Sequence, residues 1–203
     1  MLNRYVFAGT VASVLFILSL IAGFSSSTGF FVGNLVPELI GVCIELLIIL
    51  FVFDRWQKLD DQQKKIKVER RLREFLIFFL KHSFSSFPSS CQSERFYGSD
   101  HAKNQEALNN LIEHIKLNKL TSNEAKVIEE YCLKEKEIFN NLMSVSSELE
   151  NDHFKSWVRI SYFMNSIVNQ GEEVNHAVIN ILENIKRFDN TSHENNLYVG
   201  ADK

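Results

Sequence analysis

The segment NLVPELIGVCIELLIILFVFDRW, residues 34–56, is the most informative part of this 203-residue chain because it is apolar over the length of a long helix. A second apolar run, residues 5–24, precedes it and contains no acidic or basic residue. A bilayer core about 30 Å thick needs roughly 20 apolar residues in a helix, so each run is long enough to cross it. The sequence therefore predicts a transmembrane hairpin over residues 1–56, with spans at 5–24 and 30–53.

The flanks of the two runs predict the orientation of this hairpin. Basic residues follow the second run, whereas the connecting sequence SSSTG, residues 25–29, has none. The positive-inside rule then places both termini in the cytoplasm. A cleaved signal peptide is the alternative for the first run, because the small residues of GFSSS, residues 23–27, allow cleavage. The run is longer than the roughly 7–15 apolar residues of a signal peptide, which favours a span.

Residues 57–82 predict a juxtamembrane helix with a basic flank, in which eight basic residues outnumber four acids over residues 54–73. Beside a membrane, such a flank attracts anionic lipid headgroups with about 1 kcal/mol per basic residue near the surface. The chain has no recognisable nucleic-acid motif, and its net charge is -3, so no direct nucleic-acid partner is predicted. The predicted lipid-facing residues are Arg55, Lys58, Lys64, Lys65, Lys67, Arg70, Arg71 and Arg73.

The rest of the chain predicts helices, which makes the fold all-α. Residues 83–100 contain proline, glycine and many serines and predict a loop. Apolar stripes over residues 101–188 predict a small cytosolic helical bundle, and the polar residues 189–203 a flexible tail. The sequence TSNE at 121–124 predicts a capping box, and Asp152 is expected to cap a later helix. The clearest apolar stripe consists of Val174, Ala177, Val178, Ile181, Leu182 and Ile185.

No motif indicates catalysis. The three cysteines, Cys43, Cys91 and Cys132, have neither metal-ligand spacing nor a disulfide pattern. The sequence has no glycine-rich phosphate loop and no nucleophile elbow. We therefore expect a protein that is not an enzyme and that needs no cofactor and no metal.

Two Glu-x-x-His matches, at 150–153 and 173–176, are the strongest metal candidates, because paired motifs of this kind build di-iron sites in helical bundles. Such ligands must point inward, whereas His176 lies off the apolar stripe and His153 lies near a predicted turn. Both motifs are therefore interpreted as solvated faces. The remaining histidines are also predicted at the surface: His82, His101, His114 and His193.

Two acids interrupt the second apolar run. Glu38 and Glu45 are one heptad apart, which places them roughly 20° apart on one helix face. This polar stripe consists of Asn34, Glu38, Gly41 and Glu45. A small-residue face on the first run offers a surface for close helix packing: Gly9, Ala12, Ser19 and Gly23. Two interpretations stay open, a protonated and hydrogen-bonded Glu45 in a plain anchor, or a self-associating interface that admits water.

The run LVPELIGVCIELLIILFVFDRW, residues 35–56, with a basic helix and a small helical domain after it, resembles the two-transmembrane effector proteins of bacterial anti-phage systems, including those encoded beside retrons. The resemblance implies a toxin-like effector of the bacterial inner membrane, which perturbs the membrane and stops the infected cell when the bundle receives an infection signal. It supplies no catalytic residues.

The alternative is a passive membrane-anchored adaptor whose bundle recruits a cytosolic partner. In either case a second copy or a protein partner is expected to support the bundle, because a core of about 90 residues is marginal.

Overall fold

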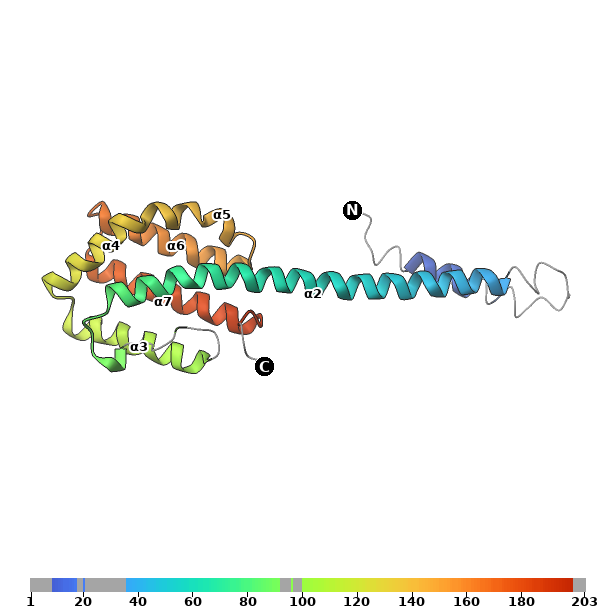
Figure 1. Ribbon diagram of the computed structural model, residues 1–203, viewed down its shortest axis with the longest axis horizontal. Helices are drawn as coiled ribbons and strands as arrows, with labels where there is room; N and C mark the ends of the chain where they lie inside the picture. Colours follow the sequence, from blue (N-terminus) through green and yellow to red (C-terminus); the bar gives the residue numbers. More distant parts are fainter. Residues whose placement is uncertain (1–8, 18–19, 21–35, 92–95, 97–99, 199–203) are drawn as a thin grey trace. The chain divides into compact units, whose positions relative to one another are not determined.

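The computed structural model describes residues 9–17, 20, 36–91, 96 and 100–198, and within these residues the chain is all-helical, as the sequence predicts (Figure 1). The chain divides into two compact units, Met1–Asp61 and Gln62–Lys203. The longest helix, α2, runs from Val36 to Ser83 and joins the predicted second span and juxtamembrane segment into one element of 48 residues.

The transmembrane prediction does not agree with this structure. Among the residues described, no helix combines the length and the apolar character that a membrane crossing requires. Of the first apolar run, residues 9–17 and Leu20 are described, and they are helical. In α2, Glu38 and Glu45 interrupt the apolar part, and Asp54 and Arg55 end it. The predicted inner-membrane location is therefore wrong, and the transmembrane hairpin has no support.

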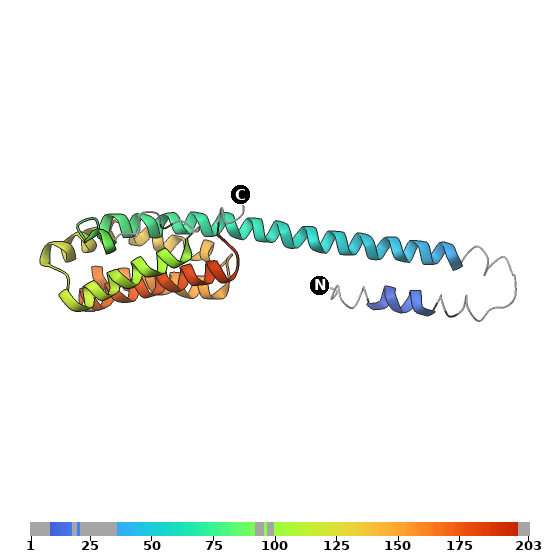
Figure 2. The same cartoon turned by 90° about the horizontal axis from the view of Figure 1, so that it is seen from below.

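The second unit is a helical bundle. After α2, the chain forms a short 3-10 turn and five further helices: η2 (Ser89–Cys91), α3 (His101–Asn118), α4 (Ser122–Asn141), α5 (Met143–Ser146), α6 (Asn151–Val168) and α7 (Val174–Glu194). Helix α7 packs against both α6 and α3, and α4 packs against α6 (Figures 1 and 2). The central position of α7 follows from its wide apolar stripe, of which Val174 is half-buried and the other five predicted members are buried: Ala177, Val178, Ile181, Leu182 and Ile185.

Aromatic side chains attach α2 and α6 to α4. Phe75 and Phe79 of α2 lie edge-on to Phe139 and Tyr131, with ring centroids 6.3 and 5.6 Å apart. Trp157 of α6 stacks on Phe139 at 5.0 Å and donates a hydrogen bond from Nε1 to the Phe139 carbonyl oxygen at 2.9 Å. Because the indole N–H has a partner, this large side chain is fully buried without leaving a donor unsatisfied.

The helix ends agree with the sequence in one place and differ in two. The capping box is present, since Thr121 accepts from the Glu124 backbone and the Glu124 side chain accepts from the Thr121 backbone. Asp152 is not a cap, because α6 begins at Asn151 after the N-cap residue Glu150. The predicted tail does not begin at Asp189, because α7 continues to Glu194. Leu197, further along, is also buried.

Candidate functional site

A buried ionic cluster is the strongest polar feature of the bundle. Glu69 and Arg73 lie one turn apart on α2, and Arg73 Nε donates to Glu69 Oε1 at 2.7 Å. Arg73 Nη1 donates to Asp189 Oδ1 of α7 at 2.7 Å. The side chains of Arg73, Glu69 and Asp189 are only 4%, 2% and 0% exposed. Because a buried charge is costly unless it is paired, these contacts hold α2 and α7 together.

Polar groups from α3 and from the C-terminal segment complete the shell of Asp189. Its Oδ1 accepts hydrogen bonds from Asn104 Nδ2 at 3.2 Å and from the Tyr198 hydroxyl at 2.7 Å. Its Oδ2 accepts from Gln105 Nε2 at 2.9 Å and lies 3.0 Å from His101 Nδ1. We call these residues, with Glu69 and Arg73, the ionic cluster.

Asp189 and Arg73 of the ionic cluster are held in their ionised forms because each has several partners. Burial opposes ionisation of Asp189, but the Arg73 guanidinium and the hydrogen bonds outweigh burial and hold the pKa of that carboxyl below its usual value. Burial also disfavours charged Arg73, yet the two acids raise its pKa. The guanidinium is further covered by the rings of Phe96 and Tyr198, whose centroids lie 5.2 and 4.9 Å from Cζ.

A serine, a histidine and an acid also meet beside the ionic cluster. Ser192 Oγ donates to Glu69 Oε1 at 2.8 Å, and His153 Nε2 lies 2.9 Å from Ser192 Oγ. This arrangement is not a nucleophilic triad, because the acid contacts the Ser192 hydroxyl, whereas in a triad the acid orients the imidazole. Ser192 and His153 are also 0% exposed, and Glu69 is 1% exposed, so no substrate reaches them. Burial, and secondarily Arg73, lowers the pKa of His153 to about 4.

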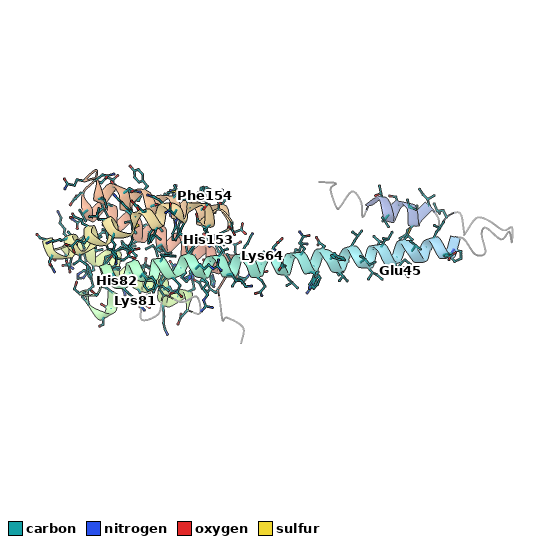
Figure 3. All side chains as sticks on the ribbon, turned by 45° about the horizontal axis from the view of Figure 1, so that its top comes forward. Glu45, Lys64, Lys81, His82, His153 and Phe154 are labelled. Atoms are coloured by element: carbon teal, nitrogen blue, oxygen red, sulfur yellow. The ribbon has the colours of Figure 1, made fainter. Side chains whose placement is uncertain are left out.

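The position of His153 corrects the expectation of a solvated Glu-x-x-His motif there, since this histidine lies inside the bundle (Figure 3). His176 of the second motif is exposed, and its Nδ1 lies 3.1 Å from Glu172 Oε2. His101, expected at the surface, is half-buried against Asp189. In the described part of the chain, no three histidine, cysteine or acidic side chains are grouped so that they could hold a metal ion.

Helix α2 places the predicted polar stripe on an open side. Glu38 and Glu45 are exposed and Gly41 is half-buried, whereas Asn34 lies outside the described residues. The more covered positions of this part of α2 recur three and four residues apart: Ile40, Cys43, Leu47, Leu50 and Asp54. At about 100° per residue, this covered face lies nearly opposite the two acids. The acids therefore do not point to the side of α2 that is partly covered.

The small-residue face is not a site of close packing where the structure describes it. A Cβ atom added at Gly9, or at Gly41 of α2, meets nothing within 4 Å. Ala12 is exposed, and Ser19 and Gly23 lie outside the described residues. The close helix approach that small residues permit therefore has no support at these positions.

Most of the predicted basic flank is at the surface, but one member is misassigned. Arg73 belongs to the buried ionic cluster and is not a lipid-facing residue. Lys65 is half-buried and forms an ion pair with Glu150 of the bundle, and Lys58 pairs with Asp54 at 2.8 Å. The other members are exposed: Arg55, Lys64, Lys67, Arg70 and Arg71.

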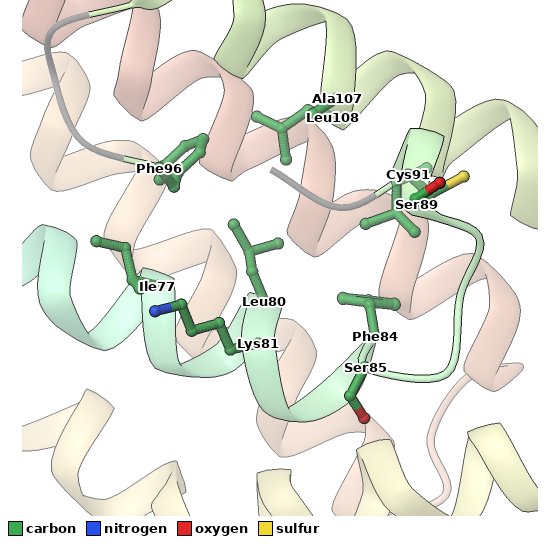
Figure 4. A pocket seen from close by; sticks show the side chains of 11 residues that line it. Ile77, Leu80, Lys81, Phe84, Ser85, Ser89, Cys91, Phe96, Ala107 and Leu108 are labelled. Atoms are coloured by element: carbon green, nitrogen blue, oxygen red, sulfur yellow. The ribbon is translucent and has the colours of Figure 1, made fainter. Parts of the chain in front are cut away.

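A pocket of about 340 Å³ lies between α2, η2 and α3 (Figure 4). Its lining is mainly apolar, with Ile77 and Phe84 from the α2 side and Leu108 from α3. Lys81 and Cys91 add polar atoms to the lining. The volume is at the lower end of ligand pockets, so it suits one apolar side chain or a small ligand.

The comparisons with known proteins give no family for this chain. No protein-family model matches the sequence, and neither a curated protein nor a solved structure is significantly similar to it.

Proposed function

We propose that this chain is a non-catalytic effector that acts by self-association, and that its setting is bacterial anti-phage defence. The observation that carries the proposal is the exposed apolar surface of α2 between residues 39 and 59. Eleven large apolar side chains there are at least 40% exposed, from Leu46 at 40% to Phe51 and Trp56 at 71%. Contiguous apolar surface of this extent usually marks an interaction site.

The bundle is the receiving part of the proposed effector. Arg73 in the second half of α2 pairs with Asp189 of α7, and Asn104 of α3 donates to the same carboxylate, so the bundle holds the helix that carries the apolar surface. The charged side chains Glu69, Arg73 and Asp189 of the ionic cluster are closed to solvent, which suits a structural clamp rather than a catalytic centre. The setting in phage defence rests on the resemblance of residues 35–56 to defence effectors.

The second candidate function is an adaptor whose bundle recruits a protein partner. The apolar pocket beside α3 favours it, because a pocket of this size accepts a single apolar side chain from a partner. An adaptor and an effector differ in what overproduction does. The effector arrests growth by itself, whereas the adaptor needs its partner.

Inducible expression in a bacterial host tests the proposal. We expect the parent chain to arrest growth and to reduce phage plating, and we expect Val52→Ser with Leu59→Ser to abolish both at matched protein levels. Leu117→Ser is the control, since Leu117 of α3 is 82% exposed but lies outside the apolar part of α2. Normal growth with the parent chain, or arrest that the double substitution leaves unchanged, would contradict the effector role.

A further inference from the structure

The exposed part of α2, residues 42–59, contains a heptad repeat. Val42, Ile49 and Trp56 follow one another at intervals of seven residues. Glu45, Val52 and Leu59 form a second series, and each of them lies three residues after a member of the first. This alternation of three and four is the a/d pattern of a coiled coil. We call these residues the seam: Val42, Ile49 and Trp56 at a positions, with Glu45, Val52 and Leu59 at d positions.

The seam is open to solvent along its whole length. Its five apolar side chains range from 49% exposed at Val42 to 71% at Trp56, and Glu45 is also exposed. In this part of the helix the half-buried residues other than Gly41 fall at b and f positions, as Cys43, Leu47 and Asp54 show. The covered face and the seam are therefore opposite faces of α2, and what covers one leaves the other open.

We infer that the seam binds the seam of a second copy of this chain in a parallel two-stranded coiled coil. This inference rests on the proposed self-association and adds its surface, its partner and its orientation. Val42 and Ile49 are β-branched residues at a positions and Leu59 is a leucine at d, a combination that favours two strands in parallel coiled coils, whereas Trp56 at a and Val52 at d depart from it.

The charges beside the seam fix the orientation. Arg55 is a g residue and Asp60 is the e residue five positions later, and both are exposed. In a parallel pair, a g residue lies beside the e residue of the following heptad on the second helix, so Arg55 of each copy faces Asp60 of the other. In an antiparallel pair g faces g, where Gly41 and Ile48 offer Arg55 no carboxylate.

The apolar area available matches that of a stable interface. Nine of the exposed large apolar side chains lie at a, d, e or g positions: Leu39, Val42, Leu46, Ile48, Ile49, Val52, Phe53, Trp56 and Leu59. At on the order of 100 Å² each, they provide roughly 900 Å² per copy, against about 800 Å² per partner in a standard interface. A second copy is thus large enough and apolar enough to cover the seam.

Glu45 is the polar exception in the seam. In a parallel pair it lies across from Glu45 of the second copy, where two carboxylates repel each other. A single polar residue at a core position fixes the register of a coiled coil and weakens it. Glu45→Leu should therefore tighten the association of the full chain by at least tenfold in dissociation constant, which sedimentation velocity measures.

Disulfide crosslinking of the full chain tests the seam. In a Cys43→Ser background, Val52→Cys should form a disulfide-linked dimer on mild oxidation, because equivalent d residues face each other in a parallel pair. Phe51→Cys is the matched control, since Phe51 is 71% exposed but occupies a c position. The remaining cysteines, Cys91 and Cys132, are buried. Equal crosslinking at positions 51 and 52, or none at 52, would overturn the inference.

Sedimentation velocity of the same samples separates the inference from the proposed function. Self-association without a crosslink at position 52 overturns the seam and leaves an effector that assembles through another surface. A monomer overturns both. Flotation of the chain with phosphatidylcholine vesicles, without a crosslink, shows that lipid covers the seam instead and also overturns the inference.

Discussion

Replacing Arg73 by methionine should destabilise the bundle strongly. Methionine keeps an apolar stem but removes the guanidinium that neutralises Glu69 and Asp189, whose side chains are 2% and 0% exposed. Removing one partner of a buried ion pair costs about 3–5 kcal/mol, because the remaining charge is left buried and unpaired. Because the free energy of unfolding of a domain is about 5–15 kcal/mol, this substitution removes a large part of the total stability.

Urea unfolding of the full chain measures this loss through the fluorescence of Trp157. That side chain is fully buried and stacks on Phe139, so its emission changes when the bundle opens. A Trp56→Phe background removes the other of the two tryptophans. Arg71→Met is the control, because Arg71 is exposed on the same helix and its loss should leave the midpoint unchanged.

The pH dependence gives the same experiment a second readout. The folded pKa of Asp189 lies below its usual value of 3.8, so the folded state holds fewer protons than the unfolded chain. The contribution of Asp189 to stability is complete above pH 3.8, and it is lost as the pH falls through the lower pKa of the folded state. The stability difference between the parent and Arg73→Met should therefore be largest at neutral pH and should narrow in acid.

A neutral version of the ionic cluster distinguishes charge from packing. Glu69→Gln with Arg73→Met and Asp189→Asn leaves no unpaired charge, and replacing a whole buried ionic group by neutral residues is often close to neutral in stability. The triple variant should thus recover much of what Arg73→Met loses. Equal unfolding midpoints for Arg73→Met and Arg71→Met at pH 7 would refute the reasoning.

The remaining predictions concern other parts of the chain. Arg55→Asp should weaken self-association, and adding Asp60→Arg should restore it, as sedimentation velocity can measure; failure of the second change to rescue the first would argue against the parallel orientation. Because burial holds the pKa of His153 at about 4, below its usual 6.5, its contribution to stability is complete above pH 6.5 and is lost as the pH falls toward 4. His153→Gln should flatten the thermal stability over that pH interval. Ile181→Asp should abolish the cooperative unfolding seen by circular dichroism, because an unpaired buried charge costs several kcal/mol, whereas Leu117→Asp at an exposed position should not.

Features that depend on near neighbours in the chain were confirmed. The capping box at Thr121 and Glu124 needs only residues three apart, and both of its hydrogen bonds are present. The α7 stripe repeats every three or four residues, and Ile181 and Leu182 are fully buried. Such local patterns identify a helix and its buried face without knowledge of what covers that face.

The ionic cluster was missed because its partners are distant in the sequence. Arg73 and Asp189 are separated by 116 residues, and no spacing rule connects them. Two local signals were nevertheless present. Glu69 and Arg73 are four residues apart, and Asp189 follows Ile185 by four residues on the apolar stripe of α7. An acid on the buried face of an amphipathic helix requires a cationic partner, and this requirement points to Arg73.

The polar stripe of α2 is a second feature that local spacing predicted only in part. The spacing of Glu38 and Glu45 correctly indicates that they share a face, because both are exposed on one side of α2. It does not indicate which side of the helix is covered. Ile40 and Leu47 lie on the more covered side, nearly opposite the acids, and the spacing of the acids alone does not predict this.

The heptad register also explains why the seam ends at Leu59. The next a and d positions are Gln63, Ile66, Arg70 and Arg73. Ile66 packs against the core of the bundle, and Arg73 is enclosed in the ionic cluster, so neither is available to a second copy. The a positions beyond Leu59 are the polar and exposed residues Gln63 and Arg70, so the apolar seam ends at Leu59.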